Sequence, residues 1–162
     1  MSVAAPSLPT LDARLARAEA ACTRRGVRLT DTRRDVLRLI LEAKEPVGAY
    51  ALLDRLRERT GAGKPPTIYR ALDFLLEQGL IHRVERLNAF VSCHDEADHQ
   101  HAAQFLICRS CGRVTELEDA DVAAAIGAVA RSKGFAPARV TVEVDGTCTQ
   151  CQEEGRRKDV LF

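Results

Sequence analysis

The first half of the chain is dominated by hydrophobic residues that recur at helical spacing. Four such segments follow one another, separated by glycine, proline and polar residues: 11–25, 31–43, 49–60 and 67–78. In the third segment, for example, Leu53 and Leu56 lie four and seven positions after Ala49. Apolar residues at this spacing line one face of an α-helix. Each segment therefore predicts an amphipathic helix with one buried side.

Two short strands are predicted directly after the fourth helix, at 80–86 and 89–92, with a turn at Leu87 and Asn88. Successive helices followed by a β-hairpin are typical of a winged helix-turn-helix domain. In such a domain the last helix enters the major groove of DNA, and its N-terminal residues face the base edges. The order of elements thus favours a DNA-binding protein over a helical protein–protein module with a scattered basic surface.

The side chains predicted to contact DNA lie on this last helix or on the segments before it: Tyr69, Arg70, Thr67, Lys64, Arg28 and Arg33. Tyr69 and Arg70 occupy positions from which base edges are read. The cations outside the helix are placed to bind phosphates, which position a protein on DNA without reading its sequence.

The pattern changes in the second half of the chain, where strand and helix signals alternate. A polar, histidine-rich connector at 93–101 precedes two predicted strands, 104–108 and 114–117. A helix then begins at Asp119, which can cap it, and the last strand covers 139–145. The helix presents three apolar residues at helical spacing: Val122, Ile126 and Val129.

These signals together predict an α+β protein with two folded domains. The N-terminal domain, residues 1–92, is the winged helix-turn-helix, and residues 93–101 form a hinge. Residues 102–162 form a small α/β domain. A length of 162 residues is enough for two small cores of this kind.

Four cysteines occur in two pairs of identical spacing, Cys108 with Cys111 and Cys148 with Cys151. Each pair can present two thiolates to one ion, and four sulfurs complete a tetrahedral zinc site. Such a site leaves no open position for a substrate. We therefore predict a structural zinc ion that joins the two ends of the C-terminal domain.

A second set of metal-binding side chains gathers around the junction of the two halves: His82, Cys93, His94, His99, His101 and Glu116. His82 belongs to the first predicted strand of the hairpin, whereas Glu116 follows the first cysteine pair. One thiolate, two imidazoles and one carboxylate from this set would make a tetrahedral site of charge −2 that suits zinc. The alternative is that the connector residues are merely solvated and that Cys93 is a small buried apolar group.

Charge is divided unequally between the halves. Residues 1–92 carry 16 Lys and Arg against 11 Asp and Glu, a net charge of +5, and residues 93–162 carry 8 against 12, a net charge of −4. A basic first half indicates that only this part meets a polyanion. The start of the chain lacks a signal-peptide pattern, and no apolar segment has the length of a membrane span. The spacing of the cysteines indicates free thiols or metal ligands and not disulfides. We expect a cytoplasmic protein.

Three segments resemble the ferric uptake regulator family of metal-dependent bacterial repressors. Residues 28–33, with Arg28, Thr30 and Arg33, resemble the opening-helix motif of the family, and residues 64–75 resemble the recognition helix of its zinc-sensing branch. Residues 105–112 match the metal-binding core of the family. The iron-sensing branch carries a His-His-Asp-His run at the positions of residues 102–105, where this chain has Ala-Ala-Gln-Phe.

The resemblance implies particular roles for the metal-binding residues. The regulatory ligands would be His82, Cys93, His101 and Glu116, and the four paired cysteines would hold the structural ion. It also implies a homodimer through the C-terminal domain. Two zinc ions would then be bound per subunit, and the loaded dimer would bind palindromic operator DNA and repress zinc-uptake genes.

Other functions stay open at this point. An iron-, manganese- or peroxide-responsive regulator of the same family is the first alternative. A thiol redox protein is less favoured because Cys108-Arg109-Ser110-Cys111 lacks the Trp-Cys-Gly-Pro-Cys setting of thioredoxin-like sites. A zinc deaminase is disfavoured too, since no His-x-Glu precedes a Pro-Cys-x-x-Cys. We expect no enzymatic activity.

Overall fold

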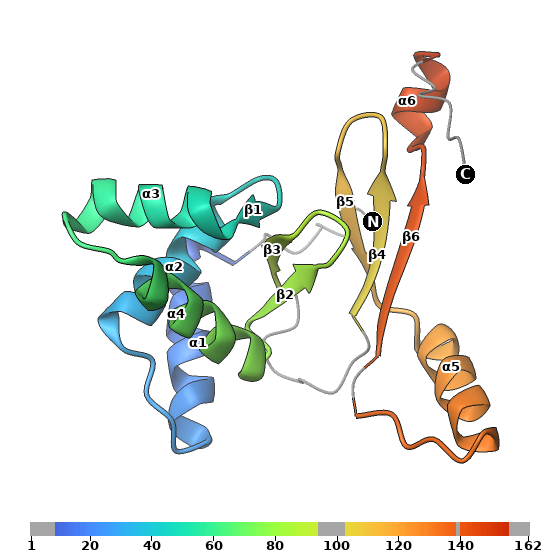
Figure 1. Cartoon of the computed structure of the whole chain (residues 1–162), viewed down its shortest axis with the longest axis horizontal. Helices are drawn as coiled ribbons and strands as arrows, with labels where there is room; N and C mark the ends of the chain where they lie inside the picture. The colour runs from blue at the N-terminus through green and yellow to red at the C-terminus, as the bar shows by residue number, and fades with distance from the viewer. Residues whose placement is uncertain (1–8, 94–102, 139, 156–162) are drawn as a thin grey trace, which may run out of the picture.

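The computed structural model describes residues 9–93, 103–138 and 140–155 of the chain (Figure 1). The N-terminal half contains the four predicted helices, α1 (Leu11–Arg24), α2 (Asp31–Glu42), α3 (Ala49–Thr60) and α4 (Pro65–Glu77). The helix α4 begins two residues earlier than predicted. Pro65 and Pro66 occupy its first turn, where amide donors have no intrahelical partner and proline is tolerated.

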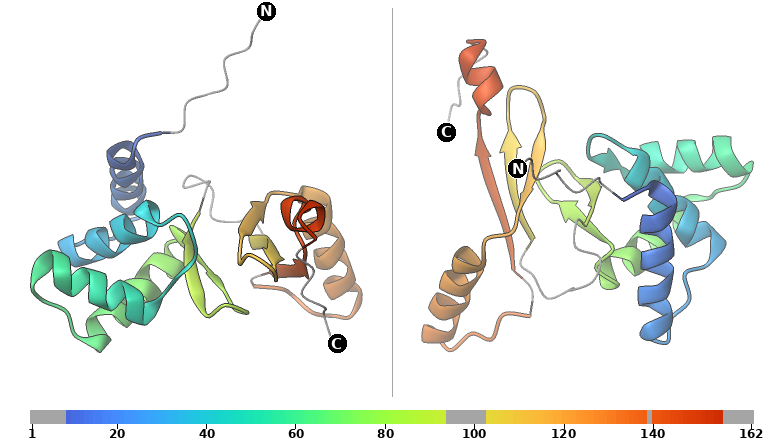
Figure 2. Two further views of the ribbon diagram at one scale, coloured as in Figure 1. Left: turned by 90° about the horizontal axis from the view of Figure 1, so that it is seen from above. Right: turned by 180° about the vertical axis from the view of Figure 1, so that it is seen from behind.

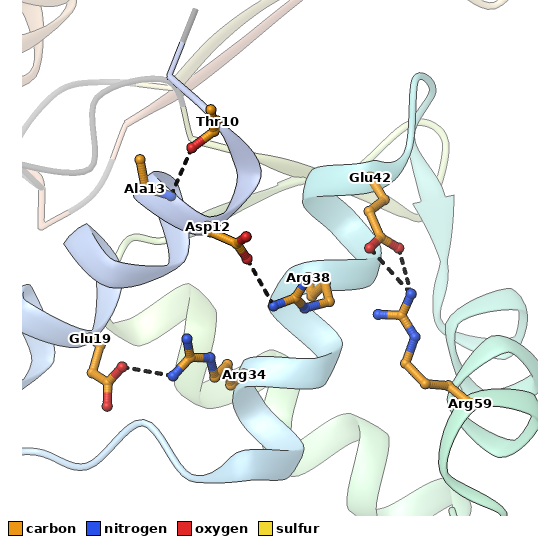
Figure 3. A network of polar contacts seen from close by, with 8 residues as sticks. All are labelled: Thr10, Asp12, Ala13, Glu19, Arg34, Arg38, Glu42 and Arg59. Carbon is orange, nitrogen blue, oxygen red and sulfur yellow. Dashed lines mark hydrogen bonds and ion pairs between the residues drawn. The ribbon is translucent and has the colours of Figure 1, made fainter.

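The helix α2 is the centre of the N-terminal core. It lies against α1, α3 and α4, and its residues Val36, Leu37 and Ile40 are buried. Surface ion pairs join α2 to α1 and α3, among them Arg34 with Glu19 at 2.8 Å (Figure 3). Exposed pairs of this kind contribute only about 0–1 kcal/mol each, so burial of the apolar faces holds the helices together.

The hairpin of the wing forms as predicted, with β2 (Ile81–Val84) antiparallel to β3 (Ala89–Ser92). Asn88 closes its turn in the left-handed conformation, with φ of 47°, which asparagine tolerates better than most residues. A third strand of two residues, β1 (Val47–Gly48), pairs with β3 on its other side. This strand was not predicted, because two residues carry no detectable alternation.

The C-terminal half is a three-stranded sheet in the order β5-β4-β6. The strands are β4 (Ala103–Cys108), β5 (Val114–Leu117) and β6 (Thr141–Gly146); β4 is antiparallel to β5 and parallel to β6. The connection to β6 contains α5 (Ala120–Ser132), and α6 (Thr149–Glu153) follows β6. As predicted, Asp119 caps α5, accepting hydrogen bonds from the backbone of Asp121 and Val122.

The wing lies between the helices and the C-terminal sheet (Figures 1 and 2). Val84 of β2 is fully buried in a small core with Phe105 and Ile107 of β4. The two halves therefore meet through this hairpin. By contrast, α5 projects from the end of the sheet opposite α6. Among the described residues, no helix is both long and apolar enough to cross a bilayer.

Candidate metal centres and nucleic-acid interface

The four paired cysteines converge at one end of the C-terminal sheet. Cys108 ends β4, Cys111 lies in the turn after it, and Cys148 and Cys151 lie at the start of α6. All four sulfur atoms lie within 4.8 Å of one another, and the sulfurs of Cys111 and Cys148 are 3.8 Å apart. Zn–S bonds of about 2.3 Å in a tetrahedron separate the sulfurs by about 3.8 Å. The donor set therefore fits a zinc ion.

The protein environment acts differently on the individual thiols of this cluster. The backbone N–H of Cys148 donates to the sulfur of Cys108 at 3.3 Å, and such backbone hydrogen bonds lower the pKa of Cys108 to about 6. Burial, together with hydrogen bonds to the neighbouring cysteines, raises the pKa of Cys151 to about 12. Full deprotonation of the cluster is thus unfavourable without a cation, and a bound divalent ion supplies that charge.

The second cluster brings together His82 from β2, Cys93 immediately after β3, and Glu116 from β5. Their ligand atoms also lie within 4.8 Å of one another. Nε2 of His82 is 3.2 Å from Oε1 of Glu116, and the two side chains are only 9% and 6% exposed. An ionised carboxylate buried to this degree is stabilised by a positive partner. A thiolate, an imidazole and a carboxylate form a donor set that suits zinc.

Three of the four predicted regulatory ligands are therefore adjacent in the structure. The fourth, His101, lies outside the described residues, as do His94 and His99. His101 accordingly stays a prediction.

The position of Cys93 is fixed by its backbone. Its N–H donates to the carbonyl of Leu80 at 3.1 Å, and its own carbonyl accepts a hydrogen bond from the guanidinium of Arg14 at 3.0 Å. Arg14 belongs to α1 and is 79 positions away in the sequence. Sequence reasoning missed this contact because no local pattern connects the two residues. The first helix is thus attached directly to the second cluster.

The predicted base-reading residues lie on the exposed face of α4. Tyr69 and Arg70 are exposed, as is Thr67 in the turn before them, whereas the neighbouring Ile68 and Ala71 face the core. Lys64 is exposed at the residue before the helix. The arrangement leaves these side chains accessible to a ligand that approaches the start of α4.

Arg33 has contacts within the protein that the sequence did not reveal. Its guanidinium stacks on the ring of Phe74, 3.7 Å from the ring centroid, and donates to the carbonyl of Arg28 at 2.8 Å. Arg28 itself is exposed. Arg33 therefore helps to fix the segment that carries Arg28.

Tyr50 was missed at the sequence level. It lies in the first turn of α3, is 72% exposed, and lines a hollow of about 220 Å³ together with Tyr69, Asp73 and Arg83. The available signal was its position between the apolar residues of the helix, which places it on the outer face. The two tyrosines of the chain are both in this hollow.

Comparison with known proteins identifies the family. The sequence profile of the Ferric uptake regulator family matches residues 24–145. The chain belongs to this family.

Several relatives within the family are named for zinc. The chain is 45% identical over 139 residues to the zinc uptake regulation protein of Escherichia coli (strain K12), which covers 86% of this chain and 81% of the relative. It is 33% identical to the protein of that name from Mycobacterium tuberculosis, over 78% of this chain and 96% of the relative. A solved structure of a zinc uptake regulator complexed with zinc and DNA is 42% identical, with a TM-score of 0.85 over 91% of this chain and 99% of that one.

Two forms of another relative differ in their similarity to this structure. Holo XcZur is 49% identical over 86% of this chain and 96% of its own, with a TM-score of 0.80. Apo XcZur is 48% identical over 88% and 97%, yet its TM-score is 0.51. Because identity and coverage are nearly equal, sequence divergence does not account for the difference. The present structure is more similar to the holo form than to the apo form.

Proposed function

We propose that this protein is a zinc-responsive transcriptional repressor. As a zinc-bound homodimer it binds palindromic operator DNA and represses genes for zinc uptake. The names of the relatives and the zinc- and DNA-bound structure support this function. The observation that carries it is the cluster of His82, Cys93 and Glu116, because its ligands come from both halves of the molecule.

The two clusters have separate roles in this proposal, with one ion each per subunit. Cys108, Cys111, Cys148 and Cys151 hold a structural ion, whose four sulfur ligands leave no open coordination position. His82, Cys93 and Glu116, with His101 as the fourth ligand, hold the regulatory ion. Bound zinc supplies a divalent positive charge at each site. The cysteine cluster stabilises one half, whereas the second cluster fixes the angle between the halves.

The regulatory step is a shift between conformations. The ligands of the second cluster meet only when the wing lies against the C-terminal sheet, so the ion binds the closed form preferentially. Changing a closed population from 1% to 99% requires about 5.5 kcal/mol of differential binding. Linkage also requires operator DNA to tighten zinc binding by the same factor as zinc tightens DNA binding.

Homodimerisation through the C-terminal half is supported by its uncovered apolar residues. Among the described residues of this half, six large apolar side chains are at least one-third exposed in the single chain: Leu106, Val122, Ile126, Val129, Phe135 and Val144. A second subunit can bury these side chains and relate two copies of α4 by a two-fold axis. Such a dimer reads a palindrome when the two helices are about 34–36 Å apart.

DNA contacts are assigned to the basic N-terminal half. Tyr69 and Arg70 face the bases, Thr67 contacts the DNA beside them, and Lys64, Arg28 and Arg33 contact phosphates. We add Tyr50, since its exposed ring shares a hollow with Tyr69. The acidic C-terminal half stays away from the polyanion.

Operator binding at buffered free zinc tests the function. We expect the fluorescence anisotropy of a palindromic operator from a zinc-uptake promoter to rise as zinc is added. It should return to its starting value after mild chelation. One zinc ion per subunit should stay bound after chelation. A response to ferrous or manganous ions at lower concentration than to zinc would favour the other metal sensors of the family. Binding that is indifferent to all three metals would refute the proposal.

A further inference from the structure

The wing contacts the C-terminal sheet at a second place, on the edge opposite the regulatory ligands. There the carboxylate of Glu143 in β6 accepts two hydrogen bonds from consecutive backbone amides of the wing turn. The N–H of Glu85 donates to Oε1 at 2.6 Å, and the N–H of Arg86 donates to Oε2 at 3.1 Å. Hydrogen bonds to an ionised acceptor are roughly twice as strong as those between neutral groups.

Strand register explains why both contacts occur on one face. Phe105 of β4 pairs with Glu116 on one side and with Glu143 on the other. Side chains at paired positions of neighbouring strands point to the same face of a sheet. The ring of Phe105 also packs edge-on against His82, with the centroids 5.8 Å apart. One row of the sheet thus carries a metal ligand, an apolar contact and a hydrogen-bond acceptor for the wing.

The next residue on this face of β6 extends the contact. Asp145 lies 2.9 Å from the guanidinium of Arg86, and both side chains are partly exposed. Exposed ion pairs contribute little. Glu143 is therefore the principal residue of this edge, and Asp145 assists it.

We propose that Glu143, assisted by Asp145, is a metal-independent latch that holds the wing against the C-terminal sheet. These two residues and their contacts to Glu85 and Arg86 are called the β6 latch. It acts at one edge of the sheet, while Glu116 binds the regulatory ion at the other. Glu143 is a positioning residue, since the described contacts place it on the wing backbone and not among the metal ligands.

The latch has a quantitative consequence that rests on the proposed function. It favours the closed form before the ion binds, so the ion has less of the conformational change to drive. Weakening the latch raises the free-zinc concentration required for closure by the same factor as it lowers the closed population. Operator affinity at saturating zinc is unchanged, because the loaded protein is closed in either case.

The test compares Glu143→Gln with Glu118→Gln in the full-length protein. Glu118 is an exposed carboxylate in the loop between β5 and α5, so its variant controls for the loss of one negative charge. A glutamine at 143 retains one acceptor but turns an amide donor toward the second N–H. We expect the zinc midpoint for operator binding to rise about tenfold in Glu143→Gln, less than threefold in Asp145→Asn, and not at all in Glu118→Gln.

The plateau of the same titration separates the latch from other roles. An unchanged midpoint in Glu143→Gln would overturn the proposal. So would a lowered plateau with an altered salt dependence, which would indicate a DNA contact. Loss of the cysteine-bound zinc or of the thermal unfolding transition would show that Glu143 merely maintains the fold.

Amide hydrogen exchange provides a readout that does not require a zinc response. With both zinc sites loaded, where the closed form predominates, we expect the amides of Glu85 and Arg86 to exchange about tenfold faster in Glu143→Gln than in the unmodified protein. Equal exchange rates in the two proteins would refute the latch, whatever the result of the operator-binding titration. If these rates differ but the unmodified protein binds its operator equally with and without zinc, the latch stands and the proposed function fails.

Discussion

The two ligand clusters use similar chemistry but differ in where their ligands originate. The four cysteines come from the end of β4 and the start of α6, both in the C-terminal half. His82, Cys93 and Glu116 come from the wing, the residue after it and the C-terminal sheet. An ion held within one half stabilises the fold of that half, whereas an ion held between halves fixes their arrangement. In the proposed function, location in the fold, rather than ligand type, separates the structural ion from the regulatory ion.

The most severe test of this difference is Cys108→Ala. Removal of one sulfur from the four-cysteine cluster should abolish zinc binding there and unfold the C-terminal half. Structural zinc sites contribute an apparent ~10–16 kcal/mol, which matches or exceeds the stability of a typical domain. Metal analysis with circular dichroism and size-exclusion chromatography measures the loss of zinc, structure and dimer.

Cys22→Ala is the matched control for this variant. Cys22 is buried in the N-terminal core, and its burial raises the pKa of its thiol. We expect this variant to retain its zinc content and its dimeric state. Loss of zinc from Cys22→Ala would mean that the zinc loss in Cys108→Ala is not specific to the four-cysteine cluster.

The second test is Cys93→Ala, which should leave a folded dimer with one zinc ion per subunit. Without the thiolate the second cluster no longer favours the closed form. Operator affinity at high zinc should therefore fall about 100-fold, as expected when the binding-competent population drops to the order of 1%. Anisotropy measures the operator affinity, and metal analysis of the same preparation measures the zinc content. Unfolding like that of Cys108→Ala would remove the distinction between the clusters.

Arg70→Ala should separate DNA reading from metal binding. We expect both zinc sites to stay occupied and the affinity for the specific operator to fall by ~1–3 kcal/mol, with relaxed preference at one base pair. Titrations with single-base operator variants measure this. Equal losses on operator and random DNA would exclude a base contact for Arg70.

Lys64→Ala is expected to have the smallest effect of the series. A lost phosphate contact should weaken binding to specific and random DNA alike and reduce the slope of log affinity against log salt by about 1. Zinc content should again be unchanged. A sequence-dependent loss would move Lys64 from the phosphate contacts to the base-reading residues.

Most of the N-terminal fold was predictable, because helical periodicity is a local property. All four helices formed within a few residues of their predicted bounds. The differences arose where local patterns are short. The strand β1 has two residues, and the proline-led start of α4 resembled a break in the chain.

The strand β6 shows how a correct prediction can still be incomplete. Its apolar residues Val142 and Val144 alternate along the sequence and define one face of the strand. The opposite face carries Glu143 and Asp145, whose contacts with the wing depend on the register of β6 against β4. Polar residues on a half-buried strand give no local sign of a partner 57 or 58 positions away.

The sequence by itself determined the helices, the wing hairpin and the pairing of the four cysteines, since each depends on spacing between near neighbours along the chain. The family resemblance implied that His82, Cys93 and Glu116 share a site, but only the tertiary structure showed that they meet. It alone showed that Arg14 contacts Cys93 and that Glu143 contacts the wing turn. These contacts depend on strand register and on the packing of one half against the other. Such long-range relations follow from the whole core, and no short segment encodes them.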